Sequence, residues 1–449
     1  MRIAVIGSGY VGVTTGVCFA ALGHDVICVD LNPKVVDGLN SGQSHINEPG
    51  LEELLQQAVS DGRFRATSVI TEAVPGSELS FICVGTPASE SGIDLSQIRS
   101  AATQIGDALP DGGPYHVVVV KSTVVPGTTQ DVVSPILRER SGRDSGALGV
   151  CNNPEFLREG SSVDDFMDPD RIVIGQSDER AGKTVEAAYE SLDSSTFFTT
   201  LQNAELTKYA ANSLLATLIS FSNEIGAICE ATPSTSAEDV LGMLHLDRRL
   251  SPIVDGNRIQ TGILSYLAAG AGFGGSCLPK DVRALRAFAR GLNTKTALLD
   301  AVSDVNERRP GQLVAHLETA VGSELSGKNI AVLGLSFKPG TDDTRESPSL
   351  KIAMELESRR ANLRAYDPVV KPGDPSFSDV TISIRDSLES ALEGADGAIL
   401  VTSWPEFAKA DWQKLCTLMA NPTIVDGRNS LRQVNWPAEA KYLPVGEIV

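Results

Sequence analysis

The stretch Arg2-Ile3-Ala4-Val5-Ile6-Gly7-Ser8-Gly9-Tyr10-Val11-Gly12 decides the fold expected for the N-terminal part of this chain. Its apolar run predicts a buried strand, and its glycines match the pattern GxGxxG at the start of a predicted helix. Gly7 allows a tight turn, Gly9 lets a pyrophosphate approach the backbone, and Gly12 lets the helix pack closely. Because amides at a helix N-terminus bind phosphate, the pattern predicts a dinucleotide site.

A second predicted strand, residues 25–30, ends at Asp30, about where an acidic residue binds the ribose 2′-hydroxyl of a dinucleotide. A carboxylate there repels the 2′-phosphate of NADP, so we expect NAD as the cofactor. Lys34 suits either a contact to the adenosine side or an exposed helical position. Thr86 and Thr123 each follow a predicted strand, where a dinucleotide lies in an open sheet.

Strand-like and helical segments alternate over the first 200 residues, which predicts a parallel, doubly wound sheet. Residues 201–230 contain no proline and carry apolar residues at helical spacing, which predicts one long helix. Strand-like runs return near the C-terminus. We therefore expect an α/β fold with a Rossmann-like NAD-binding domain (1–200), a central helical domain (201–320) and a second Rossmann-like domain (321–449).

The composition excludes several classes of function. The formal net charge of −19 over 449 residues disfavours nucleic acid as a partner. No apolar run reaches the length of a membrane span, and the chain opens directly on a strand with no signal peptide, so we expect a cytoplasmic protein. The 7 cysteines and 5 histidines are scattered without ligand spacing, so neither disulfides nor a metal site is expected.

The segment Gly272-Phe273-Gly274-Gly275-Ser276-Cys277-Leu278-Pro279-Lys280-Asp281 places one cysteine in a glycine-rich loop. A cation nearby, such as Lys280, or the start of a helix favours the nucleophilic thiolate. A Gly-Gly-Ser-Cys turn is not typical of a buried core cysteine. Together with a dinucleotide site, Cys277 predicts oxidation through a covalent thiol adduct.

Two pairs of polar residues have a spacing of four. Glu155 and Glu159 share a face if residues 153–160 are helical, and either suits a general base, although a solvated helix start explains the same pattern. Lys208 and Asn212 offer a cation and an amide that could stabilise an oxyanion, or they form a surface pair.

Three cations follow predicted strands of the C-terminal region. Lys338 and Arg345 lie in one loop, and Arg428 follows the last strand that we predict. Cations at the strand ends of a second doubly wound domain suit a diphosphate.

With these motifs in order over nearly the whole chain, the sequence resembles the UDP-glucose/GDP-mannose dehydrogenase family. The motifs on which this resemblance rests are GSGYVG (7–12), STV (122–124), NPEFLREG (153–160), GFGGSCLPKD (272–281), GLSFKPGTDDTRESP (334–348) and DGRN (426–429). The resemblance implies two Rossmann-like domains joined by a long helix, a homodimer formed through the helical centre, and NAD-dependent four-electron oxidation of a nucleotide sugar at C6, from alcohol to acid.

The resemblance also implies residue roles. Cys277 forms a thiohemiacetal and then a thioester, while Asp281 and Glu155 handle protons and the hydrolytic water. The full catalytic set is Cys277, Lys208, Asp281, Asn212, Glu155 and Thr123. The expected NAD contacts are Gly7, Gly9, Tyr10, Val11, Gly12, Asp30, Lys34, Thr86, Thr123, Glu159, Lys280 and Arg345. The expected nucleotide-sugar contacts are Glu155, Phe156, Leu157, Arg158, Glu159, Lys208, Asn212, Tyr266, Gly274, Lys338 and Arg428.

The chain departs from the family pattern in residues 247–267, which are longer than expected. Where the family uses one arginine to reach the partner subunit's site, this chain offers Arg248, Arg249 and Arg258. The segment 169–175 resembles UDP-glucose enzymes more closely, whereas residues 277–281 and the loop 336–338 also suit GDP-mannose enzymes. We favour UDP-glucose as the substrate, oxidised to UDP-glucuronate for polysaccharide synthesis. GDP-mannose and a UDP-N-acetylhexosamine are the alternatives, followed by a two-electron hydroxyacid-type dehydrogenase and an inactive nucleotide-sugar binding protein.

Overall fold

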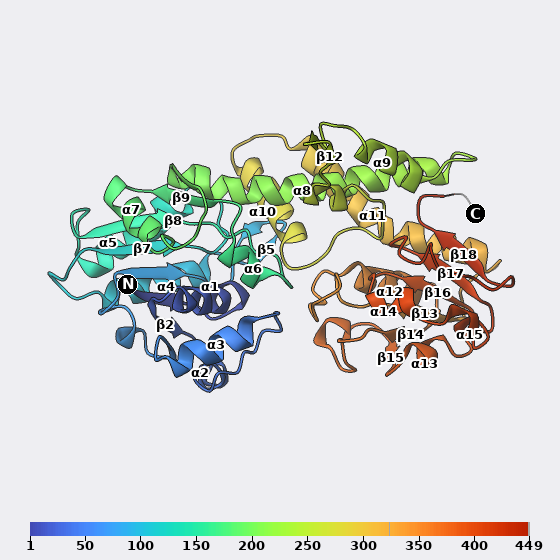
Figure 1. The fold of residues 1–449 in the computed structure, drawn as a ribbon, viewed down its shortest axis with the longest axis horizontal. Helices are drawn as coiled ribbons and strands as arrows, with labels where there is room; N and C mark the ends of the chain where they lie inside the picture. Colours follow the sequence, from blue (N-terminus) through green and yellow to red (C-terminus); the bar gives the residue numbers. More distant parts are fainter. Residues whose placement is uncertain (323, 448–449) are drawn as a thin grey trace. The chain divides into compact units, whose positions relative to one another are not determined.

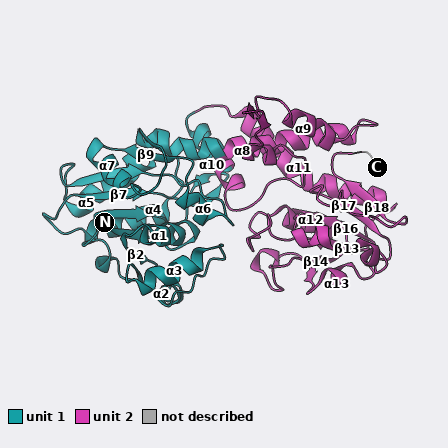
Figure 2. Ribbon diagram, in the orientation of Figure 1, with its two compact units in different colours: residues 1–211, 283–292 teal, residues 212–282, 293–449 magenta. Residues whose placement is uncertain are grey.

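The computed structural model describes residues 1–322 and 324–447. It divides into two compact units, residues 1–211 with 283–292 and residues 212–282 with 293–449 (Figure 2). No helix within the described residues is both long and apolar enough to cross a membrane. The expected division into three domains stays a prediction.

The first unit is built on an eight-stranded sheet in the order β10-β9-β8-β7-β4-β1-β2-β3 (Figure 1). All neighbouring strands are parallel except β8 and β9. The strands are β1 (Arg2–Ile6), β2 (Asp25–Val29), β3 (Phe64–Thr67), β4 (Leu79–Ile82), β7 (His116–Val120), β8 (Leu148–Asn152), β9 (Ile172–Gln176) and β10 (Thr196–Thr199).

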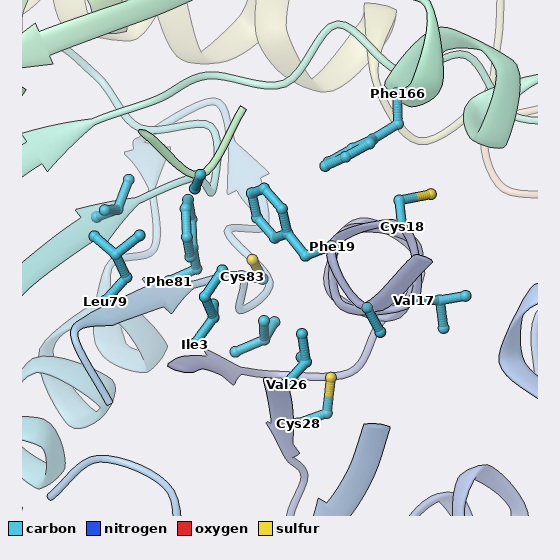
Figure 3. Packing of buried hydrophobic residues seen from close by; sticks show 14 of the residues in the cluster. Ile3, Val17, Cys18, Phe19, Val26, Cys28, Leu79, Phe81, Cys83 and Phe166 are labelled. Carbon is cyan, nitrogen blue, oxygen red and sulfur yellow. The ribbon is translucent and has the colours of Figure 1, made fainter. Parts of the chain in front are cut away.

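Helices cover both faces of this sheet. They are α1 (Tyr10–Ala21), α2 (Pro33–Asn40), α3 (Leu51–Ser60), α4 (Ser96–Ala108), α5 (Ser134–Ser141), α6 (Ser162–Met167) and α7 (Glu179–Ala187), with a small hairpin of β5 (Ala88–Ser89) and β6 (Gly92–Ile93). Alternate residues of β1 belong to two different hydrophobic core clusters. Ile3 packs in one cluster with Phe19, and Ala4 packs in the second. Figure 3 shows Phe19 beside Phe81, with ring centroids 5.1 Å apart. A strand buried on both faces is typical of a parallel sheet, as predicted.

The long helix predicted over residues 201–230 is present as α8 (Leu201–Glu230). The boundary between the two units falls within it, after Ala211. The central region continues with α9 (Ala237–His245), the hairpin β11 (Ile253–Val254) and β12 (Asn257–Arg258), the 3-10 turn η3 (Gly262–Tyr266), α10 (Leu278–Gly291) and α11 (Ala297–Ala320). This helical centre confirms the expected architecture.

The second unit contains a six-stranded, wholly parallel sheet in the order β15-β14-β13-β16-β17-β18. Its strands are β13 (Asn329–Leu333), β14 (Asn362–Tyr366), β15 (Ile382–Ile384), β16 (Gly397–Leu400), β17 (Thr423–Asp426) and β18 (Lys441–Pro444). Its helices are α12 (Pro348–Ser358), α13 (Leu388–Leu392), α14 (Pro405–Lys409) and α15 (Trp412–Cys416). Both sheets contain the Rossmann strand order, so the predicted fold class is confirmed.

An aromatic cluster packs at one edge of this second sheet. The ring centroids of Trp412 and Trp436 lie 5.0 Å apart, and the Trp436 ring stacks on Tyr442 at 4.8 Å. Trp412 is fully buried. These rings, with the apolar residues of α13 and α15, form the core on one face of the sheet.

Candidate active site

The turn after β1 has the geometry that a dinucleotide phosphate needs. Gly7 has φ 94°, and a Cβ at Gly12 would lie 1.8 Å from the Gly7 oxygen, so both positions require glycine. At Gly9, no atom lies within 4 Å of the place of a Cβ. The N-terminus of α1 has no side-chain cap. Open space beside uncapped helix amides fits the pyrophosphate of a dinucleotide.

Other predicted cofactor contacts gather at the carboxyl ends of neighbouring strands. Asp30 directly follows β2, and its Oδ2 accepts a hydrogen bond from the Ser8 amide at 3.0 Å. The Thr86 hydroxyl donates to the Thr123 carbonyl at 2.8 Å, which brings the loops after β4 and β7 together. Lys34 is exposed in the first turn of α2.

Glu48 anchors this region, and the sequence motifs did not reveal it. Its carboxylate is buried and accepts from the Ser162 amide at 2.6 Å and the Gly160 amide at 2.7 Å. The Tyr10 hydroxyl also donates to Glu48, and burial together with this partner raises the pKa of Tyr10. Glu48 therefore ties the glycine turn to the end of the segment 153–160.

The segment 153–160 follows β8 and is not helical, so the shared helical face predicted for Glu155 and Glu159 is wrong. The Glu155 Oε2 accepts from the Leu157 amide at 2.6 Å, which holds the backbone in a local turn instead of a helix. Behind it, the buried Lys121 donates to the Asn153 side chain at 3.0 Å. A regular helix, α6, begins only at residue 162.

Within the first unit, Glu155 pairs with Lys208 of α8. The Glu155 Oε1 and the Lys208 Nζ are 2.8 Å apart, and both side chains are buried. The Lys208 ammonium also lies 5.7 Å from the ring centroid of Phe156, and the Arg171 guanidinium lies 4.1 Å from the same centroid. The structure thus brings Lys208 together with Glu155 and Phe156, two predicted substrate residues about fifty positions earlier in the sequence. Removing one member of such a buried pair costs about 3–5 kcal/mol.

The remaining predicted contacts of this segment are half-buried or exposed. Leu157 packs against the core, Arg158 pairs with Asp165 at 2.5 Å, and Glu159 is half-buried. Their roles toward the substrate and the cofactor stay predictions.

Cys277 is the exposed cysteine of the chain, and the other six are buried. It directly precedes α10, and its carbonyl accepts from the Asp281 amide at 2.9 Å, which closes the first helical turn. The thiol therefore lies at a helix N-terminus, where the helix dipole favours the thiolate. The Ser276 hydroxyl lies 3.6 Å from the sulfur.

Asp281 binds two other predicted site residues. Its carboxylate is 1% exposed, with Oδ1 2.5 Å from the Lys280 ammonium and Oδ2 2.6 Å from the Asn212 amide nitrogen. Asn212, Lys280 and Asp281 therefore form one polar cluster in the second unit. The NAD contact predicted for Lys280 stays a prediction.

The glycines before Cys277 pack against the loop after β13. A Cβ at Gly274 would lie 2.3 Å from the Glu346 oxygen, and one at Gly275 would lie 2.8 Å from the ring of Phe337. Lys338 lies in the same loop, with its ammonium 5.5 Å from the Phe337 ring centroid. Only glycine allows this approach between the cysteine segment and the loop of the second sheet.

The other predicted cations of the second unit are held by defined partners. The Arg428 Nη1 would be 3.2 Å from a Cβ at Gly270, so this guanidinium lies beside the segment that leads to Cys277. Burial lowers its pKa to about 10, and it stays charged at neutral pH. Arg345 pairs with Asp343 at 2.7 Å. Tyr266 is half-buried at the end of η3.

The insertion 247–267 holds two of its three arginines within itself. Arg249 pairs with Asp247 at 2.5 Å, and Arg258 donates to the Ser251 carbonyl at 3.0 Å. Arg248 is exposed. The contact of one of these arginines to a partner subunit stays a prediction.

Three family models cover most of the chain. Residues 1–193 match the NAD binding domain, residues 202–308 the central domain and residues 331–433 the UDP binding domain of one family. The chain belongs to the UDP-glucose/GDP-mannose dehydrogenase family. The resemblance read from the motifs is confirmed, and so is NAD as the cofactor of a dehydrogenase of this family.

Individual relatives agree with this assignment. The chain is 41% identical to the UDP-glucose 6-dehydrogenase of Haloferax volcanii over 95% of its own length and 96% of that protein. It is also 41% identical to the GDP-mannose 6-dehydrogenase of Pseudomonas putida, over 87% of this chain and 85% of that protein. The solved UDP-glucose dehydrogenase of Pyrobaculum islandicum matches with a TM-score of 0.89 and 38% identity, covering 100% of this chain and 98% of that one.

Proposed function

We propose that the chain oxidises UDP-glucose at C6 to UDP-glucuronate, with two hydride transfers per substrate. The observation that carries this proposal is the exposed Cys277 thiol at the N-terminus of α10, in a family dehydrogenase with a dinucleotide site. A simple alcohol dehydrogenase needs no thiol. A thiol that adds to an aldehyde allows the second oxidation. The adduct is a thiohemiacetal, whose carbon again bears a hydroxyl group and a hydrogen that can leave as hydride.

NAD, when bound beside Gly9, accepts a hydride in each of the two oxidations. In the first, the C6 hydroxyl loses its proton and the carbon becomes an aldehyde. The Cys277 sulfur then bonds to that carbon and gives a thiohemiacetal, whose oxidation leaves a thioester. Water cleaves the carbon–sulfur bond, which releases the acid and regenerates the thiol.

The polar pairs supply proton transfer and charge stabilisation in this scheme. Lys208 and Asn212 stabilise the oxygen as it gains negative charge. Glu155, held by Lys208 at 2.8 Å, and Asp281, held by Asn212 at 2.6 Å, accept protons and orient the water. Thr123 joins the network of water and cofactor.

The nucleotide part of the substrate meets the second sheet in this proposal. Residues 331–433 match the UDP binding domain of the family, and the two cations Lys338 and Arg428 follow strands of that sheet. Their charges suit a diphosphate. Gly274, just before Cys277, and Tyr266, at the end of η3, complete the contacts that we assign to the nucleotide sugar.

GDP-mannose is the main alternative substrate, since a GDP-mannose 6-dehydrogenase is as similar in identity as the UDP-glucose enzyme. The UDP-glucose relative is matched over more of this chain, 95% against 87%. A UDP-N-acetylhexosamine ranks third.

The test is the yield of NADH per molecule of limiting UDP-glucose, measured beside GDP-mannose. Two NADH per UDP-glucose, with GDP-mannose inert, is the expected result. Turnover of GDP-mannose alone would keep the mechanism and overturn the substrate. One NADH, or none with either sugar nucleotide, would contradict the thioester route.

We also propose that the chain forms a homodimer through α8 and acts in the cytoplasm. Leu214, Phe221 and Ile228 recur every seven residues along α8, and their side chains are exposed on one helical face. Phe221→Asp should convert a dimer into a monomer in light scattering. An unchanged mass, or a monomeric wild type, would contradict this interface.

A further inference from the structure

The segment Gly270–Gly275, which leads to Cys277, has no regular secondary structure. Glycine-rich backbone has a wide choice of conformations, so something outside the segment must fix it. Its backbone is held by side chains of α8 and α11, all within the second unit. Neither helix contributed these side chains to any sequence motif.

Asn306 of α11 holds the backbone of Phe273 in both directions. Its Oδ1 accepts from the Phe273 amide at 2.7 Å, and its Nδ2 donates to the Phe273 carbonyl at 3.0 Å. Such a pair fixes both position and orientation, as a β-bridge does. The neighbouring Gly272 has φ 99°, and a Cβ there would lie 2.7 Å from the Asn306 oxygen.

Gly270 is held from two helices at once. Its amide donates to the Asn223 Oδ1 of α8 at 2.7 Å, and its carbonyl accepts from the Arg309 Nε of α11 at 2.8 Å. Arg309 is fully buried, and its guanidinium is fixed by the Glu230 carboxylate at 2.8 Å. The segment therefore has two held backbone positions before the thiol, and α10 begins directly after it.

We propose that Asn306, together with Asn223 and Arg309, is a positioning residue that sets where Cys277 lies relative to the N-terminus of α10. None of the three belongs to the catalytic set, so they act through the backbone of the segment. Displacements of about 0.5 Å are enough to weaken a catalytic geometry, which is why a two-way hydrogen bond is effective here. The effect on turnover rests on the proposed function, whereas the effect on the thiol does not.

The test uses Asn306→Ala in the full-length protein. We expect kcat to fall at least tenfold, about 1.4 kcal/mol, while KM for NAD changes less than twofold. The pH midpoint of Cys277 alkylation by iodoacetamide should rise, because a displaced thiol loses the influence of the helix N-terminus. Since the other cysteines are buried, alkylation reports on Cys277, which Cys277→Ser verifies.

A matched control comes from the first unit. Asn40 makes the same two-way pair with the backbone of Ala66, at 2.7 Å and 2.9 Å. Asn40→Ala removes a similar pair, at a more exposed position and outside the proposed site. It should leave kcat and the alkylation profile unchanged.

An Asn306→Ala variant that loses thermal stability but keeps the wild-type kcat and alkylation midpoint would overturn the proposal. If this variant fails to fold, Asn223→Ala removes one of the bonds to Gly270 and should raise the same midpoint by a smaller amount. An unchanged midpoint in a folded Asn223→Ala would equally contradict the proposal. The midpoint requires no nucleotide sugar, so a failed UDP-glucose assay leaves this test intact.

Discussion

The two Rossmann-like sheets place an aspartate at the same topological position and give it opposite environments. Asp30 follows β2, is half-buried, and accepts one hydrogen bond on each oxygen, from the Ser8 and Asn32 amides. Asp367 follows β14 and is 2% exposed. A carboxylate offers about four lone-pair sites. Asp30 keeps accepting capacity for a ribose hydroxyl.

Asp367 has none left. It accepts six hydrogen bonds, from the Leu335 amide, the Ser336 amide and hydroxyl, the Val369 and Val370 amides and the Trp404 indole. An acidic residue at the end of the second strand therefore binds a ligand only where the chain leaves its oxygens available. In the second sheet the same position holds the fold together.

The largest expected loss of stability comes from removing the Asp367 carboxylate. Asp367→Ala leaves four backbone amides, three of them in buried residues, and an indole without their acceptor, at a cost on the order of 4 kcal/mol. Urea unfolding measures it. Asp30→Ala is the matched control and should change the free energy of unfolding by less than about 1 kcal/mol. Equal losses in the two variants would erase the proposed difference between the aspartates.

One glycine from each of the two turns, Gly334 and Gly9, sharpens the comparison. Gly334 has φ 87°, and its Cβ would lie 2.4 Å from the Cβ of Thr402, so Gly334→Ala should cost about 3 kcal/mol of stability. Gly9 has φ −67° and open space at its Cβ. Gly9→Ala should keep stability and raise KM for NAD at least tenfold, because the new methyl group occupies the space for the phosphate. A wild-type KM in Gly9→Ala would mean that NAD binds elsewhere.

A buried histidine in the first sheet makes stability depend on pH, and the second sheet has no such group. His116 of β7 bonds to the Ser77 carbonyl and the Ser80 hydroxyl, and burial lowers its pKa to about 4. Residues 324–447 contain no histidine. Because the folded pKa lies below the unfolded value, the unfolded chain binds the proton first, and stability falls as pH drops from 6.5 toward 4.

His116→Gln should reduce the loss of stability between pH 7 and pH 5 by about 2 kcal/mol. The measurement is urea unfolding at both pH values. The same loss in the variant and the wild type would assign the acid sensitivity to other groups, such as the partly buried His24, whose pKa is also lowered by burial.

The smallest expected effect concerns the cofactor preference. Asp30→Ala should lower kcat/KM for NAD about tenfold, about 1.4 kcal/mol, because the ribose loses its acceptor. NADP turnover should not fall, since the charge that repels its 2′-phosphate is gone. Asp367→Asn should leave the ratio of NAD to NADP rates unchanged. A preserved NAD preference in Asp30→Ala would show that other residues read the ribose.

The sequence predicted what local patterns encode. The turn Gly7–Gly12, the long helix α8 and the helix start after Cys277 each depend on neighbours within a few residues. The helical face expected for Glu155 and Glu159 was wrong because the carboxylate of Glu155 binds its own backbone and a lysine 53 positions away. A local sequence pattern around Glu155 does not include that lysine.

The positions that sequence reasoning missed are held by long-range contacts. Glu48 meets amides at residues 160 and 162, and Asn306 meets Phe273. In each case a side chain serves the backbone of a remote segment, so neither partner carries a local signature. A buried single polar residue with no motif around it is the weak signal that both share.

The aromatic cluster on the second sheet has an optical consequence. All three tryptophans, Trp404, Trp412 and Trp436, belong to the second unit, and the first unit has none. Indole fluorescence therefore reports only on the second unit, while circular dichroism records both. Where fluorescence and circular dichroism give different urea midpoints, the transition that fluorescence does not record belongs to the first, NAD-binding unit. The unfolding of the two units is then separated without an added label.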